Sequence, residues 1–586
     1  MARLALRRAV VRRVTPVPIV RRAVPPAAHA LEAAGIAPLW ARLYAARGIA
    51  TAGELDHTLA ALPSHTALRN ADVAAARLAR AIAAQERIVV VADYDADGAT
   101  ACAVAVTGLR AFGANVGFIV PNRFEYGYGL TPEIVALAAA GAPHVIVTVD
   151  NGIASVDGVA AATARGIDVI VTDHHLPGAA LPAPAIIVDP NQPGCAFPSK
   201  HIAGVGVVFY VLIALRAALR HAGAFTGRSE PKLAALLDLV ALGTVADVVP
   251  LDQTNRVLVG QGLARIRAGR AHAGVAAMFA VAGRDPARAT AFDLGFVAGP
   301  RLNAAGRLAD MSLGIRCLLA DSEAEAQSHA EELDRLNRER RDVEATMQAQ
   351  ALTDLDTLGA AAAVAAGDAF SVCLYRAEWH PGVVGIVAAR IKDRLHRPAI
   401  VFARGNDGAL RGSGRSIAGF HLRDALDLVA KRLPGTIGRF GGHAYAAGLT
   451  LPESALASFA AAFEAVAREK LTPAQLRRTA ETDGPLDPGA LTLPLACALR
   501  DEVWGQGFEP PTFDGVFDVG RQRVVGERHL RIELAREGEC LEAVVFGHVA
   551  PLPARIHAAY RPQVNAWNGR ETVELVIEHW LPAAPA

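Results

Sequence analysis

Between residues 87 and 189 the sequence alternates short runs of apolar, β-branched residues with stretches long enough to form helices. Continuous apolar strands separated by helices are typical of a parallel sheet that helices cover on both faces. The sequence therefore predicts an α/β domain with a doubly wound parallel sheet. The predicted strands are residues 88–91, 116–120, 145–149, 169–171 and 186–188.

Acidic residues or histidines follow nearly every one of these predicted strands. In a parallel α/β sheet, ligands bind beyond the carboxyl ends of the strands, so these side chains are expected to line one shared site. A further acid, Asp247, ends the segment GTVAD, which follows a predicted helix. The side chains at the strand ends are Asp93, Asp95 and Asp97 in DYDADG, Asp150 in VTVDNG, and Asp173, His174 and His175 in TDHH.

Carboxylates combined with one or two imidazoles form a hard shell of oxygen and nitrogen ligands, which suits Mn²⁺ or Mg²⁺. Two such ions about 3.5–4 Å apart can generate a hydroxide and stabilise both oxygens of an in-line phosphoryl displacement. Two simpler interpretations compete. Asp97 taken alone fits a helix N-cap equally well, and DYDADG resembles the start of an EF-hand loop. Val104 stands where that loop needs its bidentate Glu, so a two-metal site is favoured.

The rest of the chain predicts three further parts. Residues 322–352 are highly charged and lack Gly and Pro, which indicates a long, solvated connecting helix. Residues 371–470 have the pattern of a second α/β domain. Residues 513–580 alternate with period two, and Asn568-Gly569 predicts a tight hairpin, so a small antiparallel barrel is expected at the C-terminus.

Composition limits the cellular setting. The net charge of +1 gives no general attraction to polyanions, so a nucleic-acid site must come from local clusters. The six cysteines are scattered, which fits a reducing compartment. The longest apolar run, residues 202–215, is too short to span a bilayer and predicts a buried helix. We therefore expect a cytoplasmic protein with no membrane segment, preceded by a disordered basic arm over residues 1–38.

The order DYDADG, VTVDNG, TDHH and GTVAD resembles the four motifs of the DHH phosphoesterase family. The resemblance implies that Asp95, Asp150, His174 and Asp247 hold one metal ion. It implies that Asp150 bridges to a second ion, which Asp93 also holds, and that His175 faces the substrate phosphate. Some members of this family have a His four residues before the first Asp, where this chain has Val89. The second ion is therefore expected to complete its shell with the substrate phosphate.

Within this family, the chain resembles the RecJ exonucleases from about residue 39 to its C-terminus. The resemblance rests on PNR at residues 121–123, GPRLNAAGR at 299–307, GSGRS at 412–416 and GGH at 441–443. It also rests on the predicted barrel, which lies where RecJ has an OB-fold. It implies a Mn²⁺- or Mg²⁺-dependent exonuclease that degrades single-stranded DNA 5′→3′ to 5′ mononucleotides, in DNA recombination and repair. Single-strand-binding protein and a helicase are the expected partners, and the chain is expected to be a monomer.

The residues expected to contact the DNA follow from these segments. We interpret residues 412–416 as a turn whose backbone N–H groups, hydroxyls and guanidinium cradle a terminal phosphate. In the barrel, basic and aromatic side chains would hold a single strand; the candidates are Arg521, Arg523, Arg531, Trp567 and Arg570. The candidate phosphate contacts are Arg123, Arg301, Asn303, Arg307, Ser413, Arg415 and His443.

These interpretations divide the chain into a DHH domain (39–320), a connecting helix (321–368), a DHHA1 domain (369–472) and an OB-type domain (473–586). Two alternatives remain open. A hydrolase of short oligonucleotides or cyclic dinucleotides would share the first two domains but would not need the barrel. A non-catalytic scaffold would have lost its metal ligands, whereas here only the Val89 position departs from the pattern.

Overall fold

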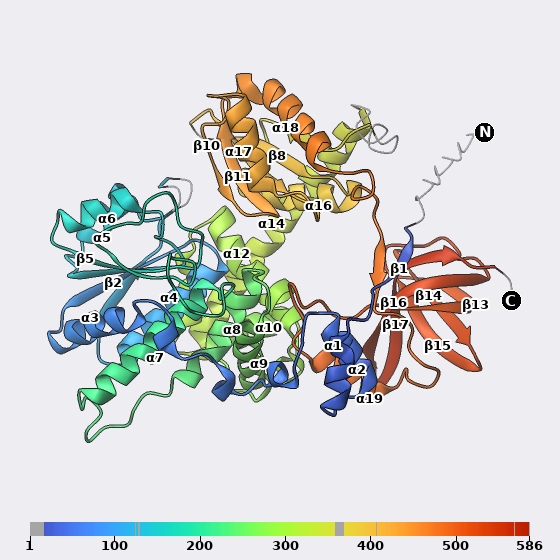
Figure 1. Ribbon diagram of the computed structural model, residues 1–586, viewed down its shortest axis with the longest axis horizontal. Coiled ribbons are helices and arrows are strands. Elements are labelled where there is room, and N and C mark those ends of the chain that lie inside the picture. The colour runs from blue at the N-terminus through green and yellow to red at the C-terminus, as the bar shows by residue number, and fades with distance from the viewer. Residues whose placement is uncertain are drawn as a thin grey trace. The chain divides into compact units, whose positions relative to one another are not determined.

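The computed structural model describes residues 17–122, 125–126, 129–357, 368–405, 407–567 and 569–584, and the chain divides into two compact units (Figure 1). Because the chain passes between the units more than once, each unit is discontinuous in sequence. Unit 1 comprises Met1–Ala52, Arg477–Glu502 and Pro510–Ala586, and unit 2 comprises Gly53–Leu476 and Val503–Glu509.

The first domain of unit 2 contains the predicted parallel sheet. Its strand order is β3-β2-β4-β5-β6, and every neighbouring pair is parallel. Helices α5 and α6 pack on one face of the sheet, and α3, α4 and α7 lie on the other (Figure 1). The doubly wound prediction is confirmed. The elements are α3 (Ala71–Ala83), β2 (Arg87–Ala92), α4 (Ala96–Ala111), β3 (Asn115–Ile119), α5 (Pro132–Ala139), β4 (Val145–Val149), α6 (Val156–Thr163), β5 (Asp168–Thr172) and β6 (Ile186–Val188).

A group of helices follows the sheet and packs beside it. Helix α7 (Gly204–His221) is long and apolar enough to cross a membrane, but 67% of it is buried inside the protein, as in many core helices. A π-helical turn, Leu294–Ala298, leads directly into α12. The other helices are α8 (Leu237–Ala246), α9 (Gln253–Arg267), α10 (Ala273–Val281), α11 (Ala291–Asp293), α12 (Gly299–Leu308) and α13 (Ser312–Leu319).

The predicted connecting helix is α14 (Glu323–Thr357). It is less solvated than its charge predicts, because Ala330 and Leu333 near its start and Ala351 near its end are buried. The first part packs on α10, α12 and α13, and the last part packs on α16 of the second domain. Residues 358–367, at the end of the predicted connecting segment, lie outside the described residues.

The second α/β domain has the strand order β10-β11-β9-β8-β7, in which only β7 and β8 are parallel. The prediction of a turn at residues 412–416 is wrong: Leu410–Arg415 is strand β9, hydrogen-bonded between β8 and β11. The ladder therefore occupies backbone groups that the turn would have exposed. The other elements are β7 (Val372–Tyr375), α16 (Val384–Leu395), β8 (Ala399–Arg404), α17 (Leu422–Arg432), β10 (Arg439–Gly442), β11 (Ala446–Leu451) and α18 (Leu456–Lys470).

Unit 1 contains a closed barrel with the strand order β13-β14-β15-β17-β16. The predicted barrel is confirmed, but it is not wholly antiparallel, because β15 and β17 run parallel. Trp567 pairs with Arg570, as a two-residue hairpin connection requires, and Asn568 lies outside the described residues. The strands are β13 (Phe513–Val525), β14 (His529–Arg536), β15 (Glu539–Val545), β16 (Arg555–Trp567) and β17 (Arg570–Pro582).

The predicted disordered arm is wrong for residues 19–33. Ile19–Arg21 forms β1, which pairs in parallel with β12 (Ala480–Thr482), and α1 (Ala27–Ala33) follows. The strand that pairs with β1 lies more than 450 residues away, so no local sequence pattern predicts this pairing. Residues 1–16 lie outside the described part of the chain. The unit is completed by α2 (Pro38–Ala45) and α19 (Leu493–Asp501), so the boundary predicted at residues 38–39 falls inside unit 1.

Candidate metal centre and phosphate contacts

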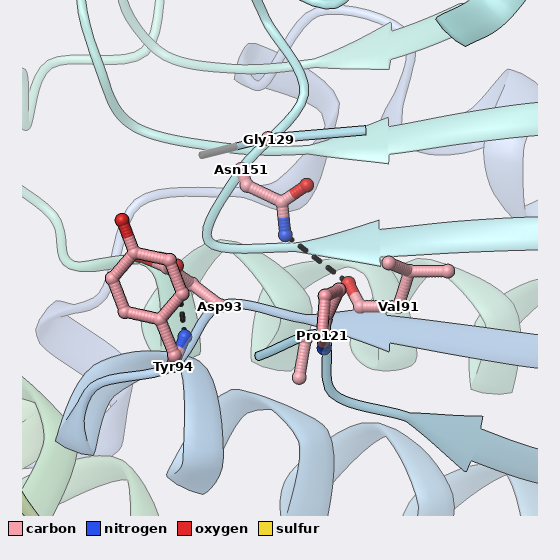
Figure 2. A pocket seen from close by; sticks show the side chains of 7 residues that line it. Val91, Asp93, Tyr94, Pro121, Gly129 and Asn151 are labelled. Atoms are coloured by element: carbon pink, nitrogen blue, oxygen red, sulfur yellow. Dashed lines mark hydrogen bonds between the residues drawn. The ribbon is translucent and has the colours of Figure 1, made fainter. Parts of the chain in front are cut away.

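The ends of β2 and β4 are tied together by Asn151. Its side-chain amide donates hydrogen bonds to the carbonyl oxygens of Val91 (3.1 Å) and Val149 (2.9 Å). Figure 2 shows this amide reaching Val91 beside Asp93, whose carboxylate accepts the N–H of Tyr94 at 2.8 Å. Asn151 therefore fixes the spacing between the two strand ends that carry Asp93 and Asp150.

Asp95 caps helix α4, because its carboxylate accepts the N–H of Gly98 at 3.0 Å. The backbone N–H of Ala96, the first residue of α4, donates a hydrogen bond to the side-chain oxygen of Asn303 at 3.0 Å. A carboxylate at a helix N-terminus is favoured by the helix dipole. The first turn of α4 is thus fixed from both sides, and Asp95 is held at the edge of the sheet.

Asp97 caps a helix, but not its own. Its buried carboxylate accepts the N–H groups of Gly204 (2.7 Å) and Val205 (3.0 Å) at the start of α7. Burial and then the charge of Asp95 raise its pKa to about 7. Asp97 therefore attaches α7 to the acid cluster.

Asp150 is buried and has a backbone φ of +62°, in the left-handed region that non-glycine residues rarely adopt. Such strain concentrates at functional sites. Gly204 lies so close that a Cβ there would be 2.6 Å from the Asp150 carboxylate oxygen, so only glycine fits without a shift. Burial, followed by the charges of Asp97, Asp95 and Asp247, raises the pKa of Asp150 well above its usual value.

His174 points its Nε2 at two of these acids. This atom is 3.1 Å from an Asp150 oxygen and 3.5 Å from an Asp247 oxygen, without hydrogen-bond geometry to any described residue. Burial, and then the charge of His175, lower its pKa to about 3, so the ring is neutral. A neutral imidazole has the lone pair that a metal ion requires.

Asp173 orients the second histidine of the pair. It accepts the N–H of Ile153 (2.9 Å) and of His174 (2.8 Å), and it lies 2.8 Å from Nδ1 of His175. Burial opposes a charge on His175, but Asp173 outweighs it and raises the pKa to about 10. Burial likewise opposes the charge on Asp173, and its bond with His175 more than offsets this and lowers its pKa. His175 is therefore a fixed cation at the rim of the cluster.

These side chains converge as the sequence predicted. Three groups have ligand atoms within 4.8 Å of one another, and Asp150 belongs to two of them. Burial and then the charges of neighbouring acids raise the pKa of both Asp150 and Asp247, and a divalent cation at this place would relieve the repulsion. The residues therefore fit a metal site. The groups are Asp93, Asp95 and Asp150; Asp150, His174 and His175; and Asp97, His174 and Asp247.

The second α/β domain carries three candidate phosphate contacts, and one of them, His443, lies against this cluster. The His443 ring stacks on His175 with centroids 6.0 Å apart, and burial and the charge of His175 lower its pKa. Arg415 donates to the Ser413 hydroxyl (3.1 Å) and the Gly414 carbonyl (2.8 Å). No carboxylate within the described ranges pairs with Arg415, and burial lowers its pKa. A half-buried guanidinium with no acidic partner in the described ranges is suited to an anionic ligand.

The candidates on α12 are engaged within the protein. Arg301 pairs with Asp334 of α14 at 2.8 Å, and Arg307 donates to the Gly382 carbonyl at 2.8 Å. Asn303 holds the first turn of α4, as described above. These contacts indicate that Arg301, Asn303 and Arg307 stabilise the structure around the site. Arg123 lies outside the described residues.

The barrel arginines surround a cavity of about 190 Å³ on β13–β15. Arg521 pairs with Glu533 and Arg531 with Glu574, each at 2.6 Å. Arg523 also lines the cavity, whereas Arg570 begins β17 and is exposed. The side chain of Trp567 lies outside what the structure describes. This cavity is basic but partly neutralised by acids.

Sequence reasoning missed the part played by the start of α7. The Gly204-Val205-Gly206 string is interpreted from the sequence as helix packing, and Gly206 does pack closely on Ile202. Gly204, however, lies against Asp150 and donates to Asp97. The available signal in the sequence was a glycine at the first position of a strongly apolar helix, which indicates a close approach of another segment to the start of that helix.

Comparison with known proteins gives matches over most of the chain. Residues 87–244 match the DHH family, N-terminal domain; residues 367–469 match the DHHA1 domain; and residues 482–579 match the RecJ OB domain. The single-stranded-DNA-specific exonuclease RecJ of Dickeya dadantii is 49% identical over 92% of this chain and 95% of its own length.

Two solved structures of RecJ from Thermus thermophilus are also similar. The complex with Mn²⁺ has a TM-score of 0.80 and 32% identity, over 97% of this chain and 80% of that chain. The complex with Mg²⁺ has a TM-score of 0.73 and 31% identity, over 97% of this chain and 79% of that chain.

Proposed function

The chain belongs to the RecJ family, and from this premise we propose that it is a metal-dependent exonuclease specific for single-stranded DNA. It degrades the strand 5′→3′ and releases 5′ mononucleotides, in DNA recombination and repair. The observation that carries this proposal is the convergence of Asp150, Asp247 and the neutral His174 at one end of the sheet.

Mn²⁺ or Mg²⁺ fits this donor set. Asp95, Asp150, His174 and Asp247 would hold one ion, and Asp93 and Asp150 would hold the other. When bound, the ions supply a hydroxide nucleophile and neutralise charge on the phosphate. These side chains come from separate segments of the first domain, at the carboxyl end of the sheet or the end of α8. Val89 leaves the second site short of a protein ligand, so we expect the substrate phosphate to complete it.

The remaining residues position the strand. His175, fixed by Asp173, donates a charged N–H toward the scissile phosphate. We place the 5′ end between the two α/β domains, because His443 of the second stacks on His175 of the first. Arg415 and Ser413 would bind the terminal phosphate beside Gly385 at the first turn of α16.

The other candidates would act less directly. Arg301, Asn303 and Arg307 would hold α12 and its neighbours in place, because each is bonded to the protein. Arg123 remains a candidate for the strand itself. The barrel would bind the strand farther from its end through Arg521, Arg523 and Arg531. A cytoplasmic monomer that works with single-strand-binding protein and a helicase completes the proposal.

A gel assay tests this function. A single strand is labelled at its 5′ or 3′ end and incubated with Mn²⁺, Mg²⁺ or EDTA, beside a blunt duplex of the same sequence. The 5′ label should appear at once as a mononucleotide, whereas the 3′ label should pass through a ladder of shortening strands. Duplex and EDTA samples should stay intact. Rapid loss of the 3′ label as a mononucleotide, or equal cleavage of duplex, would refute the proposal.

A further inference from the structure

Two phenylalanines outside the acid cluster are exposed as a pair. Phe292 in α11 is 58% exposed, and Phe296 in the π-helical turn is 71% exposed. Their rings stack with centroids 4.7 Å apart and planes inclined by 18°. Single exposed apolar side chains need no explanation, but a stacked aromatic pair presents a continuous π surface to solvent. The pair is therefore a candidate binding surface.

The backbone beneath the pair is fixed. Thr290 and Asp293 form a reciprocal cap, in which the Thr290 N–H donates to the Asp293 carboxylate at 2.9 Å. The π-helical turn follows directly, and such turns are rare and frequently occur at functional sites. The backbone that carries the two rings is thus held in place before any ligand binds, which lowers the entropic cost of stacking on them.

The same segment supports the acid cluster. A Cβ on Gly295 would be 3.2 Å from the Val245 side chain, and one on Gly299 would be 3.0 Å from that of Ala246. Val245 and Ala246 directly precede Asp247. The π-helical turn therefore packs on the end of α8 that delivers a candidate metal ligand, within a few residues of the site.

Two exposed arginines precede the aromatic pair in the chain. Arg284, whose side chain is 54% exposed, lies 3.8 Å from Asp293, and Arg288 of the preceding turn is 50% exposed. The contact of Arg284 with Asp293 is long and solvated, so this pair contributes little. Aromatic faces beside arginines are the surface on which successive bases of a single strand stack.

We propose that Phe292 and Phe296 form a base-stacking platform for the single strand whose end enters the acid cluster. The role rests on the proposed function and extends it, because it assigns nucleobase contacts close to the cleavage site and not only in the barrel. A platform of this kind recognises any base, since every base has a π face. It positions the strand and takes no part in the chemical step.

The first test compares the intact chain with the F292L/F296L double variant, which keeps the apolar bulk but loses the aromatic faces. Leu137→Ala, another exposed apolar position, is the control. Steady-state hydrolysis is measured on a 5′-phosphorylated strand and on the same strand with abasic residues behind its first nucleotides. We expect KM for the normal strand to rise about five- to a hundredfold in the double variant, with kcat within about twofold. The KM of the wild-type protein should be raised similarly on the abasic strand. On that strand the double variant and the wild type should have the same KM.

The second test does not depend on hydrolysis. In EDTA, 2-aminopurine is placed at successive positions from the 5′ end, and its fluorescence should be quenched at one or two positions by the wild type but not by F292L/F296L. Unchanged KM together with absent quenching would overturn the platform and leave the pair as a protein-docking surface. A wild-type protein that quenches 2-aminopurine but cleaves no single strand would instead refute the proposed function and retain the platform.

Discussion

Asp514 of unit 1 and Asp150 of unit 2 are both buried carboxylates, but their surroundings differ. Asp514, at the start of β13 in unit 1, accepts hydrogen bonds from Arg21 (2.8 Å) and Thr482 (2.8 Å) and lies 2.9 Å from Nε2 of His557. Burial alone would raise its pKa, but these partners outweigh burial and lower it. Asp150 in unit 2 is surrounded by other acids, and burial and their charges raise its pKa.

The difference separates a structural acid from a functional one. A buried carboxylate surrounded by donors contributes to folding, because its charge is compensated within the protein. A buried carboxylate surrounded by other carboxylates lowers stability unless a bound cation compensates its charge. Such clusters are typical of functional sites. The proposed metal centre therefore follows from the electrostatics of the cluster as well as from family membership.

The largest effect is expected from Asp150→Ala. Losing the carboxylate shared by two ligand groups should disturb both metal positions, so turnover on single-stranded DNA should fall more than about a hundredfold, equivalent to about 2.7 kcal/mol. Affinity for the strand should change little. The exposed Asp157 of α6 provides the control, Asp157→Ala, which should keep full turnover. A variant at position 150 that retains a tenth of wild-type turnover would remove this residue from the bridging position.

The next effect concerns Arg415, a half-buried cation for which the described residues provide no acidic partner. Arg415→Ala should abolish the preference for a 5′-phosphorylated strand over a 5′-hydroxyl strand, because a charge-assisted bond is lost. A loss of about 1.5–3 kcal/mol corresponds to roughly tenfold to a hundredfold in the use of phosphorylated ends. Arg404→Ala is the matched control, since Arg404 is exposed on the neighbouring strand and pairs with Glu453. If both variants keep the preference, the terminal phosphate binds elsewhere.

The two carboxylates should respond oppositely to loss of charge. Asp514→Asn should destabilise unit 1 by about 1–3 kcal/mol, because Arg21 and His557 lose their charged partner. Asp150→Asn in metal-free protein should leave unit 2 as stable as before or make it more stable, since one repelling charge is removed. Thermal unfolding in EDTA, followed separately for each unit, gives the comparison. A stabilising Asp514→Asn change would contradict the structural role of that acid.

The smallest effect is on the pH dependence of stability. The folded-state pKa of Asp97, about 7, lies above its ordinary value, so its stabilising contribution is greatest at low pH and is lost as pH rises through 7. Asp514, whose pKa is lowered, contributes above its ordinary range and loses this contribution only in stronger acid. Between pH 8 and 5.5, Asp97 alone should therefore add up to about 2 kcal/mol to the stability of metal-free unit 2. Unit 1 should stay level. A flat profile for unit 2 would show that the cluster is already compensated.

Sequence patterns predicted those features that depend on neighbouring residues. The strands of the first sheet are continuous β-branched runs, and Asp93, Asp150 and His174 follow their ends, so their convergence could be foreseen. The capping partner of Asp97 could not, because Gly204 lies 107 residues away.

Long-range pairing also explains the wrong predictions. The glycines at 412 and 414 favour a turn locally, but pairing with β8 and β11 makes the segment a strand. Gly412 packs against Phe402, and Gly414 against Leu422, so small residues are required there for packing and not for turning. In the same way, β1 is a strand only because Ala480–Thr482 lies beside it.

The central claim is that the acid cluster places metal ions on the phosphate that is cleaved. A strand whose 5′-terminal phosphodiester has one non-bridging oxygen replaced by sulfur tests this directly, because Mg²⁺ binds sulfur poorly and Mn²⁺ accepts it better. In single-turnover cleavage we expect one sulfur diastereomer to be cut slowly in Mg²⁺ and to recover in Mn²⁺, while the unmodified strand is cut in both. Equal rates for the sulfur strand in both metals would contradict direct metal contact with the cleaved phosphate.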